Sequence, residues 1–124
     1  MYKDKKIFDL SYYKFTGSWA WILHRLSGLA LIFYLSAHVW VISTISKGPE
    51  GFEEVMAVLA SPLFKFLEVG LWGVILFHAF NGIRIVLVDF FNGSLYHKKL
   101  FFILIFIAFA LWVTGGYLII SHIK

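Results

Sequence analysis

The chain has 124 residues, of which 60% are hydrophobic and 15% are charged, and its mean hydropathy is +0.83. A water-soluble domain of this size needs a polar surface that these residues cannot supply. The sequence contains no cysteine, which excludes disulfides, thiolate zinc sites and protein-ligated iron–sulfur clusters, and its net charge of +4 comes without the basic run that is typical of nucleic-acid binding.

The N-terminal part of the chain predicts a polar segment and then a membrane span. The first fifteen residues contain four lysines, two aspartates and no apolar core segment, so we expect no cleavable signal peptide. A first span is predicted at about residues 18–46, and Gly48-Pro49 after it is a typical helix-ending pair. Residues 49–60 then carry apolar and acidic positions with helical periodicity, which predicts a short helix in the membrane interface.

Two further spans are predicted at about residues 62–90 and 100–120. Ser61-Pro62 is suited to the cap and first turn of a helix, and Asn92-Gly93 predicts a turn. Because about 20 apolar residues cross the hydrocarbon core, the chain can hold three spans and short connections. We therefore predict an all-α integral membrane fold, with residues 1–124 forming a single transmembrane domain.

The basic residues predict the orientation of these spans. Eight of them belong to one side of the membrane and three to the other, and basic residues favour the cytoplasmic side. The N-terminus is therefore predicted in the cytoplasm and the C-terminus outside. The eight are Lys3, Lys5, Lys6, Lys14, Arg25, Arg84, Lys98 and Lys99, and the three are Lys47, Lys65 and Lys124.

Polar residues in the second span carry the clearest chemical signal. His78 lies near the middle of the span, with Gly82 one turn away and Arg84 about 9 Å further toward the cytoplasm. Ionisable groups at such depths need a partner or a cofactor. An imidazole beside a glycine can bind the iron of a b-type haem, and the arginine can reach its propionates. The alternative is an interhelical hydrogen-bonding histidine with a snorkelling arginine, and spacing alone does not separate the two.

The first span carries His24, Arg25 and His38. His24 and Arg25 can donate to a haem propionate or a quinone carbonyl, or the arginine can simply snorkel to headgroups. His38 lies fourteen residues after His24, so both side chains point to similar faces. A lone histidine in a helix is more often a packing residue than a ligand. The predicted depths of His38 and His78 differ by about 12 Å, which disfavours one iron shared by both.

Two sequence motifs resemble a known family. Residues 18–28, SWAWILHRLSG, closely resemble the first-helix signature of the cytochrome b membrane-anchor subunit of succinate dehydrogenase. Residues 78–84 and 89–90, HAFNGIR followed by DF, resemble the second-helix signature of the same family. The segment between them, GPEGFEEVMAVLASPLFKF, resembles the family's connecting segment. The resemblance thus covers most of residues 18–90, in matching order and spacing.

This resemblance implies a complex in which a flavoprotein oxidises succinate, an iron–sulfur protein carries electrons, and two small anchors in the cell membrane bind haem b and quinone. By matching positions, it implies that His78 is an axial haem ligand, with the second ligand from the partner anchor. It places His24 beside the propionates and Arg25 in the quinone site. Ser27 matches the serine or threonine of the family's HR-x-[S/T]-G pattern, whereas Trp21 stands where well-known ubiquinone-reducing members have a serine, which changes the expected quinone pose.

The resemblance leaves the number of haems and the direction of the reaction open. Relatives with one haem and with two exist, and with two haems His38 is the predicted second ligand. The same architecture serves fumarate reductases, and some relatives are haem-free anchors that only dock the soluble subunits. In each case the dehydrogenase chemistry is expected on another subunit.

Overall fold

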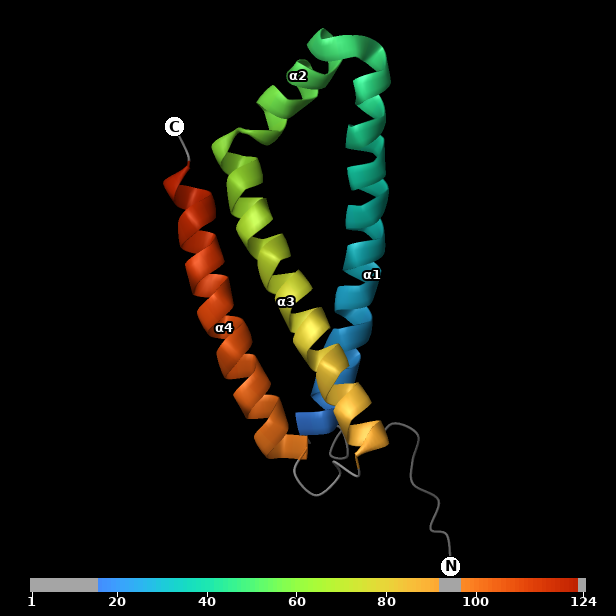
Figure 1. Ribbon diagram of the computed structural model, residues 1–124, viewed down its shortest axis with the longest axis vertical. Coiled ribbons are helices and arrows are strands. Elements are labelled where there is room, and N and C mark those ends of the chain that lie inside the picture. The colour runs from blue at the N-terminus through green and yellow to red at the C-terminus, as the bar shows by residue number, and fades with distance from the viewer. Residues whose placement is uncertain (1–15, 92–96, 123–124) are drawn as a thin grey trace, which may run out of the picture.

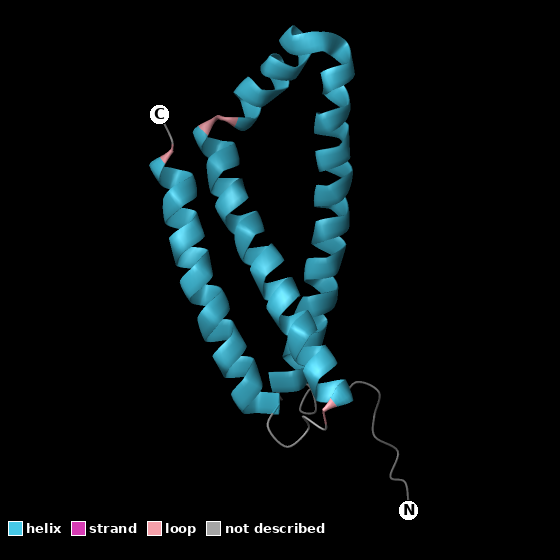
Figure 2. Cartoon of the chain, in the orientation of Figure 1, coloured by secondary structure: helices cyan, strands magenta, loops and turns pink. Residues whose placement is uncertain are grey.

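The computed structural model describes residues 16–91 and 97–122, and within these ranges every regular element is a helix. Three helices are long and apolar enough to cross a membrane, so the predicted all-α membrane fold with three spans is confirmed. The N-terminal lysines used for the topology and the Asn92-Gly93 turn lie outside the described residues. In chain order the elements are α1 (Thr16–Ser43), the 3-10 helix η2 (Thr44–Lys47), α2 (Gly48–Leu59), α3 (Pro62–Phe90) and α4 (His97–Ser121) (Figures 1 and 2).

The end of α1 tightens before the chain turns into α2. Three hydroxyl side chains here each donate a hydrogen bond of 2.6 to 2.7 Å to the carbonyl oxygen three residues earlier: Ser43, Thr44 and Ser46. Such bonds compete with the α-helical ladder and favour a short 3-10 turn. Gly48 follows with φ 88° and ψ 175°, a conformation that residues with a Cβ rarely adopt. The glycine of the predicted helix-ending pair therefore makes the turn.

The short helix α2 and the start of α3 also follow from local sequence. Pro49 lies in the first turn of α2, where its missing N–H needs no partner. Ser61 takes the N-cap position of α3 in an extended conformation with φ −66° and ψ 152°, without a side-chain capping hydrogen bond, and Pro62 occupies the first helical position. The backbone N–H of Lys65 donates to the Ser61 carbonyl at 3.1 Å. The predicted cap at Ser61-Pro62 is confirmed.

The three long helices are arranged as an open bundle (Figure 1). α1 and α3 run antiparallel and lie together at the end where α1 begins and α3 ends. They separate toward the other end, where η2 and α2 connect them (Figure 1). We call the first of these the closed end and the second the α2 end. α4 packs along α3 over most of its length.

Two tryptophans lock α3 against α4 in a reciprocal arrangement. Trp72 Nε1 on α3 donates to the Leu111 carbonyl on α4 at 3.2 Å, and Trp112 Nε1 on α4 donates to the Val69 carbonyl on α3 at 2.9 Å. Each indole lies over a glycine of the facing helix. A Cβ at either glycine would occupy the space that the indole fills, so the close approach of the indole requires glycine there. The glycine under Trp72 is Gly115 and the glycine under Trp112 is Gly73.

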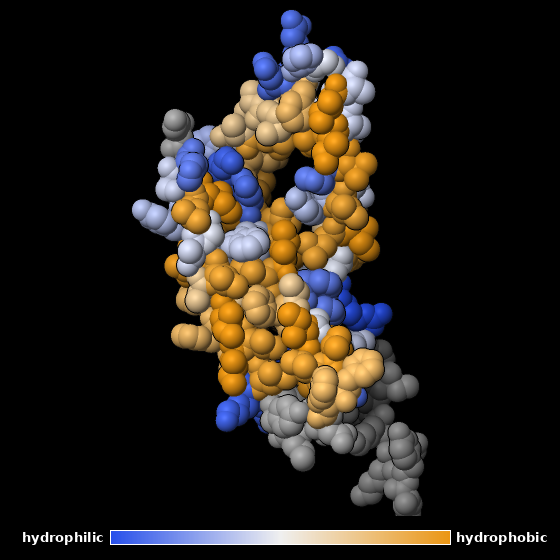
Figure 3. Space-filling model, viewed as in Figure 1, coloured by the Kyte–Doolittle hydropathy of each residue, from blue (hydrophilic) through white to orange (hydrophobic). Residues whose placement is uncertain are grey.

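The surface of the bundle is apolar and its small interior is partly polar. Large apolar side chains point outward, as Phe106 does at 74% exposure, and apolar residues cover most of the middle of the surface seen in Figure 3. In water such a surface would be costly, whereas lipid or a partner helix covers it in a membrane. The buried polar side chains among the described residues are Ser27, Thr44, Asn81 and Arg84.

Candidate functional site

A pair of stacked histidines joins α1 to α3 near the closed end. The rings of His24 and His78 lie 4.1 Å apart between centroids, with an interplanar angle of 6°. Each ring also faces a glycine of the other helix: a Cβ at Gly28 would lie 3.1 Å from His78 Cε1, and one at Gly82 would lie 3.5 Å from His24 Cε1. The flat ring that lies over Gly82 is therefore the imidazole of His24.

Ser27 belongs to this histidine pair. Its side chain is buried, at 8% exposure, between α1 and α3. The hydroxyl donates to the His24 carbonyl oxygen at 2.8 Å and also lies 2.9 Å from His78 Nδ1. The sequence singled out Ser27 but associated it with quinone. The structure instead brings it to the predicted haem ligand.

Asn81 and Arg84 form a second polar connection next to the histidines. Asn81, 2% exposed, donates from Nδ2 to the Ala20 carbonyl of α1 at 3.1 Å, and its Oδ1 accepts from Arg84 Nε at 2.9 Å. The Arg84 guanidinium also lies over the ring of Phe101 on α4, at 5.6 Å from the ring centroid. All three long helices thus meet at this level. The Arg84 guanidinium donates through Nε, and its terminal nitrogens have no hydrogen bond to another described residue.

Three imidazole nitrogens of the histidine pair have no hydrogen bond in the described part of the chain: both nitrogens of His24 and Nε2 of His78. Nδ1 of His24 is the only buried side-chain nitrogen or oxygen there without a hydrogen bond. Nε2 of His78 and Nε2 of His24 are also without a hydrogen bond there, but neither atom is fully buried. Buried polar groups are normally satisfied. This site therefore calls for a group that the described residues do not supply.

Arg25 and Trp21 form a separate pair on the outside of α1. The guanidinium carbon of Arg25 lies 4.6 Å from the centroid of the Trp21 ring, a cation–π contact between residues one turn apart. Both side chains are exposed. The three residues predicted to bind quinone are thus divided: Arg25 and Trp21 lie together on the surface, and Ser27 is buried with the histidines.

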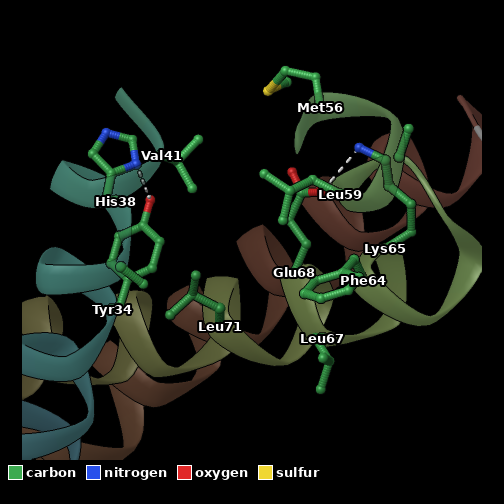
Figure 4. A pocket seen from close by; sticks show the side chains of 12 residues that line it. Tyr34, His38, Val41, Met56, Leu59, Phe64, Lys65, Leu67, Glu68 and Leu71 are labelled. Carbon is green, nitrogen blue, oxygen red and sulfur yellow. Dashed lines mark hydrogen bonds and ion pairs between the residues drawn. The ribbon is translucent and has the colours of Figure 1, made fainter. Parts of the chain in front are cut away.

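His38 lies apart from the histidine pair, at a cavity near the α2 end. The cavity has a volume of about 520 Å³ and is lined by residues of α1, α2 and α3 (Figure 4). Tyr34 Oη lies 3.5 Å from His38 Nδ1, the long limit for such a bond, so it restrains the ring only weakly. Across the cavity Lys65 Nζ pairs with Glu68 Oε2 at 3.0 Å. Met56 and Leu59 of the amphipathic helix α2 complete the apolar lining.

Sequence reasoning missed two features of the site. It gave Asn81 no role, although this side chain joins Arg84 to the backbone of α1. An asparagine three residues before an arginine in a mostly apolar helix was the available signal. It also missed that each histidine packs on the other helix's glycine, although both helices carry the same spacing, histidine followed four residues later by glycine.

The fold and the site define a class: a small multi-pass helical membrane protein with a half-buried, stacked histidine pair between two of its spans. The model of the succinate dehydrogenase/fumarate reductase transmembrane subunit family matches residues 4–115, and the chain belongs to that family.

The chain is also similar to known membrane subunits of succinate dehydrogenase. It is 34% identical over 107 residues to the succinate dehydrogenase 2 membrane subunit SdhC of Mycobacterium tuberculosis, covering 86% of this chain and 79% of the relative. It is 38% identical over 87 residues to a succinate dehydrogenase hydrophobic membrane anchor subunit of Halobacterium salinarum, covering 69% and 67% of the two chains. A third relative with that name, from Archaeoglobus fulgidus, is 34% identical over 103 residues, covering 82% and 87%. The family suggested by the sequence motifs is confirmed.

Proposed function

We propose that this chain is the haem b-binding membrane anchor of a succinate:quinone oxidoreductase. In this role it passes electrons from the iron–sulfur subunit to quinone and docks the soluble subunits, while the flavoprotein subunit oxidises succinate. The observation that carries the proposal is the position of His78 Nε2, which is not fully buried and has no partner among the described residues. Its ring is held within a membrane span by contacts with Gly28, His24 and Ser27.

The residues around His78 fit a haem. Neutral imidazole nitrogen is the usual axial ligand of a b-type haem, and the second axial ligand would come from the second small anchor subunit. Arg84, whose terminal nitrogens have no partner among the described residues, would bind a propionate, and His24 lies beside the ligand with an unsatisfied Nδ1. A bound haem would supply a one-electron carrier within the membrane. The chain's own residues would fix the orientation of the His78 ring and neutralise the negative charge of a propionate.

Arg25 and Trp21 are the proposed quinone contacts. The indole covers one face of the guanidinium and holds it on the exposed side of α1. The edge of the guanidinium then presents N–H donors in a fixed plane. Such donors stabilise the negative charge that develops on a quinone carbonyl oxygen during reduction. Where relatives have a serine hydroxyl that donates to the quinone, Trp21 would instead hold the Arg25 guanidinium in place through its ring.

The proposed orientation follows from the basic residues. Arg25 and Arg84 lie toward the closed end of the bundle, which would face the cytoplasm of a prokaryotic cell and the iron–sulfur subunit. The α2 end, with its short amphipathic helix, would lie at the outer interface of the cell membrane. Quinone bound near Arg25 would then be next to the electron donor.

His38 is the proposed ligand of a second haem near the α2 end. In support, its imidazole lines a cavity of about 520 Å³ with mostly apolar walls. Lys65 lies at the same cavity and would neutralise a propionate, although it is paired with Glu68 in the chain alone. The residues that line this cavity include neither His24 nor His78, so the two sites are separate.

The test is a reduced-minus-oxidised optical spectrum of the purified four-subunit complex, with succinate as the reductant. We expect the bands of a low-spin b-type haem. A complex that contains flavin and reduces quinone but shows no such bands would contradict the proposal and favour the haem-free anchor. Rates of succinate oxidation with quinone and of fumarate reduction with quinol, measured on the same sample, give the preferred direction of the reaction.

A further inference from the structure

The hydrogen bonds of Ser27 define which nitrogen of His78 carries hydrogen. A serine hydroxyl has one hydrogen to donate and two lone pairs with which to accept. Ser27 donates its hydrogen to the His24 carbonyl oxygen at 2.8 Å, and a carbonyl oxygen cannot be the donor. The 2.9 Å contact between the same hydroxyl and His78 Nδ1 therefore requires Nδ1 to donate. A neutral imidazole with hydrogen on Nδ1 has its lone pair on Nε2.

We propose that Ser27 is a positioning residue for His78. It selects the tautomer that exposes the Nε2 lone pair, and it fixes the rotation of the ring between Gly28 and His24. This inference deepens the proposed function, since it rests on haem ligation by His78. It assigns Ser27 to the haem ligand and away from quinone.

The backbone of α1 holds Ser27 in this role. The hydroxyl is tied to the carbonyl of His24, three residues earlier on the same helix, and its side chain is 8% exposed. The ring of His24 itself stacks on His78. A single turn of α1 thus supplies both the acceptor for Nδ1 and the surface on which the ring lies. The orientation of the ligand on α3 is therefore set from α1.

The same bonds exclude Ser27 as a donor to quinone. A quinone carbonyl oxygen accepts hydrogen bonds, and the one hydroxyl hydrogen of Ser27 is already donated to the His24 carbonyl. What remains on the hydroxyl is acceptor capacity, which a quinone carbonyl cannot use. Arg25, on the exposed side of the same helix, has guanidinium donors that no described residue accepts from, and it remains the proposed quinone contact.

A hydrogen bond from Nδ1–H to an acceptor also makes the imidazole a stronger donor through Nε2. A stronger nitrogen donor favours the more positively charged ferric iron. Removal of the Ser27 hydroxyl should therefore raise the midpoint potential of the haem bound at His78 and change its ferric electron paramagnetic resonance signal. Neither effect is expected if Ser27 only fills space.

The experiment compares four variants in the whole complex: Ser27→Ala, Ser27→Thr, Ser27→Val and the control Ser36→Ala. Ser36 also lies on α1 and donates to a carbonyl one turn earlier, at 3.0 Å from Ile32 O, but its hydroxyl has no hydrogen bond to a histidine among the described residues. Thr and Val have the same shape and differ in the hydroxyl. The readouts are the haem-to-flavin ratio, the midpoint potential, the ferric resonance signal and the KM for quinone.

We expect Ser27→Ala and Ser27→Val to keep haem, raise its potential and leave the KM for quinone within about twofold of the wild type. Ser27→Thr and Ser36→Ala should retain the wild-type potential and signal. An unchanged potential in Ser27→Ala and Ser27→Val, or a selective rise in the KM for quinone, would overturn the assignment. So would failure of both to assemble while Ser27→Thr assembles, because the hydroxyl would then serve helix assembly. Retention of a normal haem by His78→Ala would instead overturn the proposed function itself.

Discussion

The imidazole of His24 on α1 lies parallel to that of His78 on α3, with 4.1 Å between the ring centroids. Each ring is also pressed against a glycine of the facing helix. The two antiparallel helices carry the same pattern, a histidine followed one turn later by a glycine, and the histidine of each helix packs on the glycine of the other. Because of this exchange, a substitution on α1 should change the environment of a ligand on α3.

The two glycines under the histidines should differ in their tolerance of a methyl group. A Cβ at Gly28 would lie 3.1 Å from His78 Cε1, which forces the ring to move, whereas a Cβ at Gly82 would lie at an ordinary 3.5 Å from His24 Cε1. We expect Gly28→Ala to lower the free energy of unfolding by about 1 kcal/mol and to alter the haem spectrum. Gly82→Ala should be close to neutral. Thermal unfolding of the complex in detergent measures the difference, and a larger effect from Gly82→Ala would contradict this packing.

The α3–α4 contact offers a similar matched pair. A Cβ at Gly115 would fall on the indole nitrogen of Trp72, whereas a Cβ at Gly70 meets nothing within 4 Å. Gly115→Ala should therefore displace Trp72, break its bond to the Leu111 carbonyl and cost about 1–3 kcal/mol of stability. Gly70→Ala should leave the melting temperature unchanged or raise it slightly. Equal melting temperatures for the two variants would show that the tryptophan contact does not stabilise the bundle.

The sequence was sufficient to predict where the helices lie along the chain, but not which face of each helix packs against its neighbours. The helix boundaries at Gly48 and at Ser61-Pro62 follow from local backbone chemistry. They lie where the glycine and proline residues of the sequence predicted them. The depth of His78 in its span could be counted along the chain. The direction of Ser27 could not, because helices that are apolar on all sides carry no pattern that tells which face packs inward. Contacts between helices decide that rotation, and here they turn Ser27 toward His78.

Arg25 should matter for quinone reduction and not for assembly, because its guanidinium is exposed and its contact is with Trp21 of the same helix. We expect Arg25→Ala to keep succinate oxidation with an artificial soluble acceptor and to lose at least tenfold in quinone reduction. The control Arg84→Ala removes the buried arginine, so it should destabilise the complex and affect both assays. A parallel loss of both activities in Arg25→Ala would instead identify Arg25 as a structural residue.

The proposed orientation predicts the position of the C-terminus. Eight basic residues assigned to one side against three on the other favour a cytoplasmic N-terminus, and three spans then place Lys124 outside. A periplasmic-type reporter enzyme fused after Lys124 should be active in cells, and a reporter that folds only in the cytoplasm should be inactive. The reverse pattern would place the closed end and Arg25 on the side away from the iron–sulfur subunit.

The most direct test of the account is the amount of haem per covalently bound flavin in the complex that carries His78→Ala. Because Nε2 of His78 is the proposed ligand at the closed end, this variant should lose one haem per flavin and the corresponding low-spin signal. His38→Ala, measured beside it, should lose a second, spectrally distinct haem from the cavity at the α2 end. An unchanged spectrum in His38→Ala would make His38 a packing residue and leave one haem. A wild-type haem content and spectrum in His78→Ala would contradict the central claim.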